Sequence, residues 1–216
     1  MMLPTHALAG MALALPVATV APEFAGVALL AGLLGGSVPD FDMYVGHRKT
    51  LHYPVYYAAL VVPAVALAVA VPAVWTVGAA VFLIAAAAHS LADVFGGGLE
   101  LRPWEGTSDR AVYDHYRGRW IAPRQWVSYD GSPSDFVLSG ALAVPLLFSI
   151  DGPLSWAVLA ALAVAGVYAA VRRYLPSVAV RALDVIGPRL PEDVRSAVPS
   201  RYRDAHPEAF GSNMSD

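Results

Sequence analysis

Six apolar stretches constrain the fold of this chain more than any other feature of its sequence. They cover approximately residues 7–21, 24–38, 53–73, 76–95, 136–150 and 154–171. A bilayer core of about 30 Å is crossed by about 20 helical residues, so stretches of this kind are candidate membrane spans. Only 14% of the residues are charged, against about 25% in soluble domains. The sequence therefore predicts an all-α, polytopic membrane helix bundle with about six transmembrane helices, which occupies residues 1–175.

Turn-forming residues separate the stretches in pairs. Pro22 and Glu23 lie between the first two, residues 72–75 lie between the third and fourth, and Asp151-Gly152-Pro153 separates the last two. Proline and glycine favour such turns because they suit the backbone angles that turns require. The first, second and fifth stretches are short for a span, so they would need a locally thinner bilayer or a re-entrant hairpin.

The positions of the cations predict the orientation. All 14 lysine and arginine residues fall in the segments 39–52, 96–135 and 172–216, which six spans place on one side. The opposite side carries Glu23 and Asp151 and no cation. The positive-inside rule then places both termini and the large loops in the cytoplasm. We expect a multi-pass protein of the inner (cytoplasmic) membrane, with membrane lipids as partners.

The sequence also predicts the character of the two ends of the chain. Residues 176–216 are predicted to form an amphipathic and disordered cytoplasmic tail, in which 177–190 is an amphipathic helix on the membrane surface. The last residues, 207–216, are typical of a disordered end. The N-terminus lacks the positively charged region of a signal peptide, so we expect it to be retained. The net charge of −3 gives no reason to expect nucleic acid as a partner, and the oligomeric state stays open.

Residue types that ligate metals gather at the cytoplasmic ends of the predicted spans. Four separate helix ends contribute them, and two of the residues lie four positions apart on one helix face. The predicted ligands are His6, Asp40, Asp42, His52, His89 and Asp93. The chain has no cysteine, so the ligand atoms are nitrogen and oxygen. Such a set suits a divalent metal, with zinc expected and manganese or iron as alternatives.

Each of these elements also has a simpler interpretation when it is taken alone. A Pro-Asp pair after a helix often forms a turn or a cap, which would account for Asp40 and Asp42. His89 lies inside a span, where an ionisable residue needs a partner. It could be a neutral imidazole that is hydrogen-bonded to Asp93 or to a backbone carbonyl. The combination of four helix ends favours the metal site.

The same residues suggest a chemistry. Paired carboxylates can bridge two metals about 3.5–4 Å apart, an arrangement that serves phosphoester hydrolysis. Arg48 is then a candidate for binding an anionic group of the substrate. A spare carboxylate, from Asp40 or Asp42, or the imidazole of His47 would act as the general base. We therefore take His47 and Asp42 as the candidate catalytic residues.

As a set, these motifs resemble the family of membrane-bound, metal-dependent hydrolases that are also described as LexA-regulated inner-membrane proteins. The motifs are Thr5-His6, Pro39-Asp40-Phe41-Asp42, the segment His47-Arg48-Lys49-Thr50-Leu51-His52, and His89-Ser90-Leu91-Ala92-Asp93. In the third motif, Leu51 separates Thr50 from His52, which departs from the family pattern. The resemblance covers residues 5–93 and implies a metal-dependent hydrolase without naming its substrate. Arg48 and Thr50 are the predicted substrate-binding residues.

The leading hypothesis is a hydrolase that acts at the cytoplasmic leaflet on a phosphoester or a lipid-linked substrate. The alternatives are a non-enzymatic membrane protein whose His/Asp cluster binds metal structurally or in transport, and a scaffold whose loop residues only cap helices. Transport is disfavoured because it requires polar residues through the full depth of the bilayer. The large loop 113–135 is interpreted as an interfacial aromatic belt or as a lid over the site, with Asp114 and His115 as outside candidates.

Overall fold

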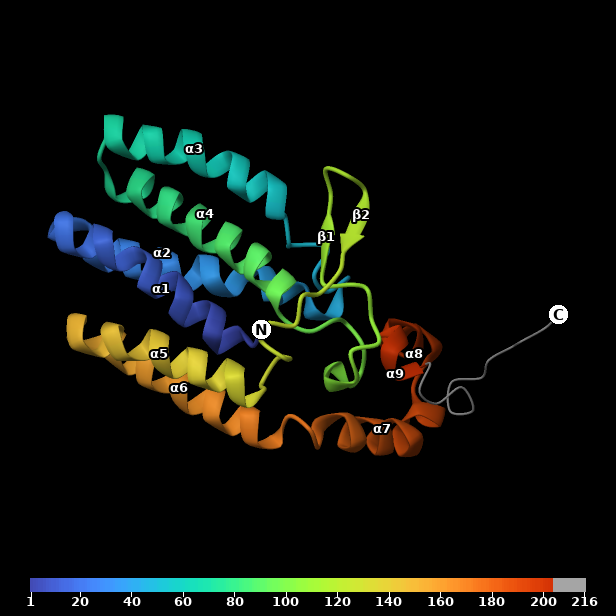
Figure 1. The fold of residues 1–216 in the computed structure, drawn as a ribbon. Coiled ribbons are helices and arrows are strands. Elements are labelled where there is room, and N and C mark those ends of the chain that lie inside the picture. The colour runs from blue at the N-terminus through green and yellow to red at the C-terminus, as the bar shows by residue number, and fades with distance from the viewer. Residues whose placement is uncertain (204–216) are drawn as a thin grey trace.

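A computed structural model of the chain describes residues 1–203. It is mostly helical, and its main body is a bundle of helices lying side by side, as predicted (Figure 1). The helices of the bundle are α1 (Leu3–Val20), α2 (Ala25–Ser37), α3 (Pro54–Ala70), α4 (Val74–Ala92), α5 (Pro133–Ser149) and α6 (Pro153–Val171). Successive helices run in opposite directions, so the connections alternate between the two ends of the bundle.

Proline sets the starts of several helices. It occupies the first turn of α1, α3, α5 and α6, where its missing N–H is not needed and its fixed φ suits a helix. The predicted turns are present: the 3-10 turn η1 (Pro22–Phe24) joins α1 to α2, and Gly152 joins α5 to α6 with a φ of 75°. These short connections place α1 beside α2 and α5 beside α6.

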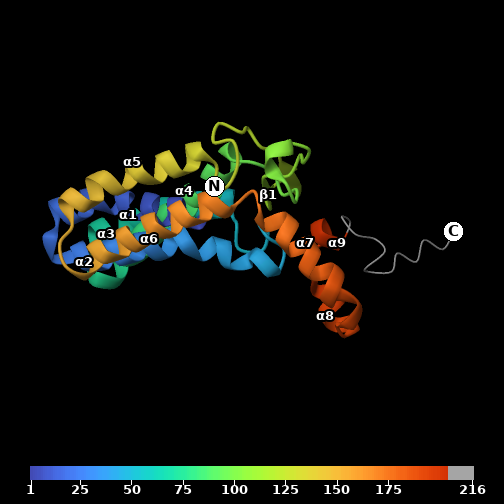
Figure 2. The ribbon, with the colours of Figure 1, turned by 90° about the horizontal axis from the view of Figure 1, so that it is seen from below.

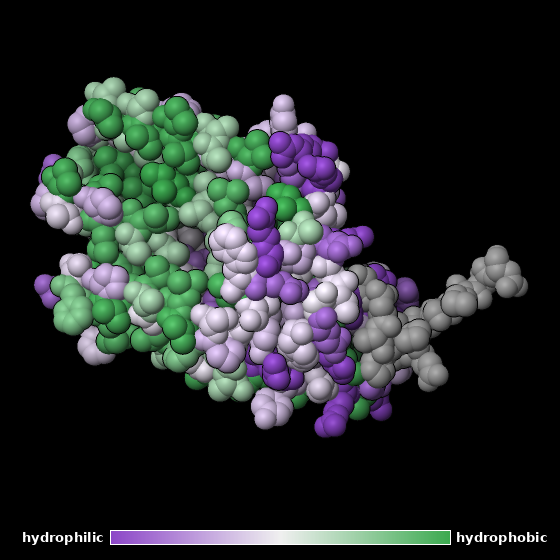
Figure 3. All heavy atoms as spheres, viewed as in Figure 1, coloured by the Kyte–Doolittle hydropathy of each residue, from purple (hydrophilic) through white to green (hydrophobic). Residues whose placement is uncertain are grey.

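Four helical segments are long and apolar enough to cross a membrane, namely Leu3–Val20, Pro22–Met43, Val74–Phe95 and Pro153–Val171. The helices α3 and α5 are apolar but have 17 residues each. The bundle also exposes large apolar side chains, among them Phe148, whose exposed fraction is 89%. On the face that Figure 3 shows, apolar residues dominate the surface of the bundle and hydrophilic residues gather mostly at one end. Such a surface suits lipid rather than water.

The bundle has its own apolar core at the contacts between α1, α2, α4, α5 and α6. The fully buried side chains of Leu8, Met11, Leu146 and Val158 belong to this core. At the polar end of the bundle, the chain forms the 3-10 turn η2 (Val38–Tyr44) after α2 and the 3-10 turn η3 (Asp93–Phe95) after α4. Both turns contain predicted metal ligands.

The polar end also contains a small sheet that the sequence analysis did not predict. Strands β1 (Val112–Asp114) and β2 (Arg119–Ile121) pair antiparallel, within the segment taken as a loop. After the 3-10 turn η4 (Pro103–Glu105), this hairpin lies beside the start of α3 (Figure 1). The backbone N–H of Tyr113 donates to the carbonyl of Arg48 at 3.0 Å. The hairpin thus fixes the loop that contains the His47–His52 motif.

The predicted tail begins with helices. They are α7 (Leu175–Ile186), the 3-10 turn η5 (Gly187–Arg189), α8 (Glu192–Ala197) and α9 (Ser200–Arg203). Figures 1 and 2 show α7 leading away from the end of α6 and beyond the bundle. The predicted amphipathic segment 177–190 overlaps α7. The predicted disordered end, 207–216, lies outside the described residues.

Candidate metal centre

Glycines allow the helices that carry the candidate ligands to approach closely. A Cβ atom on Gly10 of α1 would overlap the carbonyl oxygen of Gly32 of α2, and one on Gly35 would overlap the carbonyl oxygen of Phe82 in α4. Only glycine permits such backbone contact at these positions. The helix α2 therefore packs tightly against both α1 and α4, and the polar ends of these helices lie together.

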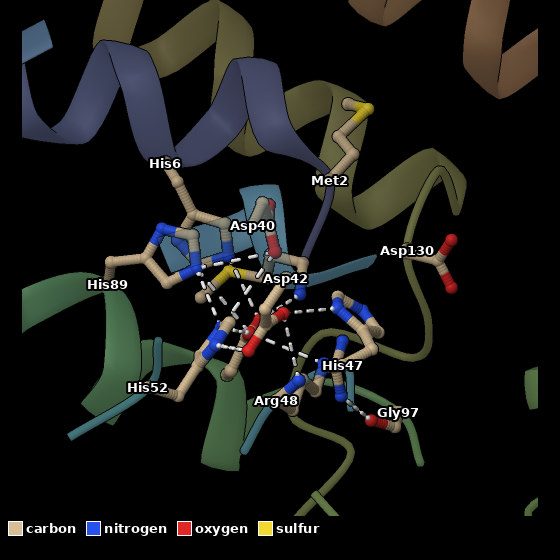
Figure 4. Close-up of polar contacts among 12 residues, drawn as sticks. Met2, His6, Asp40, Asp42, His47, Arg48, His52, His89, Gly97 and Asp130 are labelled. Atoms are coloured by element: carbon tan, nitrogen blue, oxygen red, sulfur yellow. Dashed lines mark hydrogen bonds and ion pairs between the residues drawn. The ribbon is translucent and has the colours of Figure 1, made fainter. Parts of the chain in front are cut away.

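Four of the predicted ligands form one compact group, consisting of Asp40 in η2, His52 before α3, His89 in α4 and Asp93 at the start of η3. All four side chains are buried, and one ligand atom from each lies within 4.8 Å of the others. Figure 4 shows the side chains of Asp40, His52 and His89 pointing toward one another from separate segments. The group could hold a metal ion.

The distances within the group match the spacing of ligands around one metal. The two Nε2 atoms of His52 and His89 are 3.1 Å apart. Oδ2 of Asp93 lies 3.4 Å from Nε2 of His52 and 3.7 Å from Nε2 of His89. Oδ1 of Asp40 lies 3.5 Å and 3.8 Å from Nε2 of His89 and of His52, respectively. Ligand atoms placed about 2.0–2.2 Å from a tetrahedral metal are about 3.3–3.6 Å apart.

The hydrogen bonds of the two imidazoles determine where their lone pairs point. Nδ1 of His89 donates to the carbonyl oxygen of Gly36 at 2.7 Å, and Nδ1 of His52 donates to Oδ2 of Asp42 at 3.1 Å. A carbonyl and an ionised carboxylate only accept, so each Nδ1 carries a hydrogen. In their neutral forms, the two rings therefore present the lone pairs of Nε2 to each other. A cation between them removes this repulsion, and such outer hydrogen bonds are typical of metal-ligating histidines.

The electrostatics of the group also favour a cation. Burial lowers the pKa of His52, but its hydrogen bonds with Asp42 and Asp93 and the charges of these carboxylates outweigh burial and raise this pKa to about 9. Oδ2 of Asp93 is buried, and the groups that face it are cations or imidazoles: Nε of Arg48 at 3.3 Å and Nε2 of His52 at 3.4 Å. The site therefore stabilises positive charge at the point where the four ligand atoms converge, which suits a divalent metal.

His6 and Asp42, the other two predicted ligands, lie next to the group. The Nε2 atom of His6 is 2.9 Å from Oδ1 of Asp93, and its ring stacks on that of His89 with centroids 3.7 Å apart. The amino group of Met1 lies 2.6 Å from the same Asp93 oxygen. Asp42 stands behind His52, where it accepts hydrogen bonds from His52 and from the backbone N–H of Leu51. Both residues orient ligands of the compact group.

His47 adjoins the group through Asp42. Nδ1 of His47 lies 3.0 Å from Oδ1 of Asp42, and the side chain of His47 is partly exposed. Among residues 1–203, the hydrogen bond of the His47 ring is made by Nδ1, which leaves the other ring nitrogen, Nε2, to exchange a proton with solvent or substrate. Thr50 has a different environment: it is exposed, and its hydroxyl donates to the carbonyl oxygen of Val45 within the turn. The structure thus brings His47 to the site and places Thr50 in a neighbouring turn.

Arg48 is buried against the candidate ligands. Its Nε lies 3.3 Å from Oδ2 of Asp93, and its Nη1 donates to the carbonyl of Gly97 at 2.6 Å. Burial lowers the pKa of its guanidinium, but the charge of Asp93 and of further carboxylates raises it above its usual value. The backbone of Arg48 is left-handed, with a φ of 58°, and its N–H donates to Asp42. Arg48 therefore neutralises part of the negative charge of the site.

A cavity of about 490 Å³ adjoins the group, and Asp40, His47 and Arg48 are among the residues that line it. Asp40 is the member of the compact group that reaches this cavity. A metal bound through Asp40 would therefore lie at the edge of the cavity. Of the outside candidates, Asp114 caps the turn of the β-hairpin and His115 contacts the carbonyl of Lys49, both outside the group.

A second polar cluster, whose members are not among the predicted site residues, positions the start of α1. Asp135 is fully buried and accepts hydrogen bonds from the backbone N–H of Met2 at 2.8 Å and from the hydroxyl of Thr5 at 2.7 Å. Ser132 caps α5 and accepts from the N–H of Asp135. The pattern Ser132-x-x-Asp135 is a capping signature that the sequence carries. By holding Thr5, this cluster fixes the turn from which His6 reaches the centre.

The fold and the site together define a class: a helix bundle of membrane type with a buried His/Asp group that could hold a metal ion. Comparisons of the chain with protein-family models, with curated proteins and with solved structures found no match. The resemblance to membrane-bound, metal-dependent hydrolases therefore remains a prediction from the four motifs.

Proposed function

We propose that this chain is an integral membrane, metal-dependent hydrolase whose His/Asp centre lies at the cytoplasmic face of the inner (cytoplasmic) membrane. The observation that carries the proposal is the convergence of His52 and His89 with two carboxylates beside an accessible cavity. Zinc is the expected metal, with manganese or iron as alternatives, because the ligands are nitrogen and oxygen. The proposed substrate is a phosphoester or a lipid-linked molecule.

The proposed roles follow from the contacts of each side chain. A bound metal would lower the pKa of a coordinated water and polarise the ester. His47 would be the general base: Asp42 holds its Nδ1 at 3.0 Å, so its Nε2 is available to take a proton at the cavity. Arg48 would keep its charge beside Asp93 and balance the carboxylates when an anionic group enters. The accessible cavity favours an enzyme over the alternative of a structural metal site.

The proposed topology has six spans with both termini in the cytoplasm. Three features support it: the short turns lie at one end of the bundle, the polar loops lie at the other end, and every lysine and arginine falls in the polar segments (Figures 1 and 3). The helices α3 and α5 each have 17 residues, which is the lower limit of about 17–25 residues for a span. Each must then cross a thin bilayer or one that is locally compressed.

The experiment that tests the proposed activity is hydrolysis of bis(p-nitrophenyl) phosphate by the purified protein in detergent, with zinc, manganese or iron supplied separately. We expect His47→Gln to lower kcat about 10²–10⁴-fold, the usual contribution of a general base, while the variant keeps its metal. His115→Gln is the matched control, because His115 lies outside the group, and should keep full activity. If the folded wild type hydrolyses neither this soluble ester nor a phospholipid in mixed micelles with any of these metals, the proposal is wrong.

A further inference from the structure

The cavity beside the candidate centre has an apolar wall in addition to its polar one. The polar wall contains Asp40, His47 and Arg48. The apolar wall is formed by the start of α1, the end of α6 and the start of α7, and it includes Leu3, Pro4, Val164, Leu175 and Pro176. A cavity with one polar and one apolar side is suited to an amphiphile rather than to a small soluble ester.

The apolar wall continues onto the surface that faces lipid. Val164 lies seven residues before the end of α6 at Val171, which corresponds to about 10 Å along the helix. Its side chain is 57% exposed, and that of Leu3 is 36% exposed. Both residues belong to helical segments that are candidate membrane spans. The apolar wall of the cavity therefore includes residues of α1 and α6 that are exposed on the surface of the bundle.

The polar part of the cavity offers groups that lack partners. A second cavity of about 540 Å³ shares His47, Glu100 and Arg201 with the first. Nε of Arg201 and Oε2 of Glu100 are buried and have no hydrogen-bond partner among residues 1–203. An unpartnered guanidinium N–H suits a phosphate oxygen. The unpartnered carboxylate oxygen suits a hydroxyl or ammonium group on the same head group. Arg172, by contrast, is already paired with Asp130 at 2.8 Å.

We propose that the ligand of this cavity is a phosphate-bearing amphiphile that enters from the bilayer between α1 and α6. Its chain lies against Leu3, Val164 and Leu175, and its phosphate reaches Arg201 and the edge of the candidate centre. The inference deepens the proposed function, on which it rests for the chemistry that follows binding. It selects a lipid-borne ester over a soluble one.

Photolabelling tests this proposal without requiring catalysis. The probe is an alkyl phosphate with a diazirine in its chain, incorporated in vesicles of neutral lipid that contain the full chain. We expect labelled peptides from residues 1–4 and 164–176. Val164→Trp fills the apolar wall and should lower labelling about tenfold, which corresponds to about 1.4 kcal/mol of binding free energy. Val167→Trp is the matched control, because Val167 is 66% exposed on the same helix and does not line the cavity.

A second variant tests the phosphate contact. Arg201→Gln should weaken labelling by the alkyl phosphate about tenfold and leave labelling by the corresponding alkyl alcohol unchanged. Equal labelling of the two Trp variants, or labels spread over all lipid-facing helices, would overturn the proposal. A protein that is labelled in the cavity but hydrolyses no phosphoester would refute the proposed activity alone. Hydrolysis of soluble esters without cavity labelling would refute the amphiphile proposal alone.

Discussion

The carbonyl oxygen of Gly36 accepts a hydrogen bond from Nδ1 of His89 at 2.7 Å, while a Cβ atom on Gly36 would overlap the carbonyl oxygen of His6. One glycine in α2 therefore orients an imidazole on α4 and allows α1 to approach with another imidazole. The two rings stack as a result. Close helix packing and the geometry of the candidate metal centre thus depend on the same residue.

Gly36→Ala should separate α1 from α2 and weaken metal binding. The added methyl group meets backbone atoms, which cannot move away as a flexible side chain would, so we expect a loss of about 1–3 kcal/mol in the free energy of unfolding. Gly26→Ala on the same helix is the control, since a Cβ atom there has nothing within 4 Å. Thermal unfolding and metal content in detergent check both variants. Equal effects of the two substitutions would contradict this view of the packing.

Asp42→Asn should weaken metal binding about 10–100-fold, as expected when a group that orients a metal-ligating histidine loses its charge. The amide oxygen can still accept from Nδ1 of His52, so the variant should stay folded. Asp114→Asn is the control, because Asp114 is also buried and accepts backbone hydrogen bonds, but in the β-hairpin. Competition with a chelator measures the affinity. An unchanged affinity in Asp42→Asn would show that Asp42 does not support the centre.

Asp130 connects the loop before α5 to the end of α6. Its carboxylate accepts hydrogen bonds from Arg172 at 2.8 and 3.1 Å. Burial raises the pKa of Asp130, but the hydrogen bonds and charge of Arg172 outweigh burial and hold this pKa below its usual value. Asp130 therefore stabilises the folded state above the ordinary carboxyl pKa of about 4. This contribution is lost as the pH falls through the lower pKa of the folded state.

Asp130→Asn should accordingly lower the free energy of unfolding by about 2 kcal/mol near neutral pH, which is the usual contribution of a hydrogen bond to a charged group. The difference in the free energy of unfolding between wild type and variant should shrink as the pH falls below about 4. Thermal unfolding at a series of pH values measures it. A difference that stays constant with pH would mean that the charge of Asp130 does not contribute.

The topology is tested with reporter fusions. A reporter after residue 23 and one after residue 151 should report from the outside of the inner membrane, and one after residue 216 should report from the cytoplasm. The reason is that six spans place every cation on the cytoplasmic side. An outside signal from the C-terminal fusion would refute the six-span arrangement.

Much of the fold was predictable because turn residues and apolar runs act locally. Pro22 and Gly152 mark the turns that the structure contains. The hairpin of β1 and β2 was missed, although Gly118, with a φ of 64°, lies between residues that favour strands. Its strands have three residues each, which is too short for a clear alternating pattern.

The residues of the candidate site could be predicted from the sequence, but the contacts between them could not. Histidine and aspartate at helix ends pointed to one face of the bundle, and Asp40, His52, His89 and Asp93 do meet there. The pairing of Arg48 with Asp93, 45 positions apart, depends on the packing of α4 against the loop before α3. The role of Asp42 behind His52 also follows from tertiary geometry, because sequence spacing does not distinguish a ligand from the residue that orients it.

The most direct test of the central claim is the metal content of the purified wild-type protein, measured by elemental analysis after dialysis. We predict about one divalent transition metal per chain, with zinc expected. This content should be lost in His89→Ala and kept in His115→Ala. A folded wild-type protein that contains no such metal, and that takes up none when zinc, manganese or iron is supplied, would contradict the account.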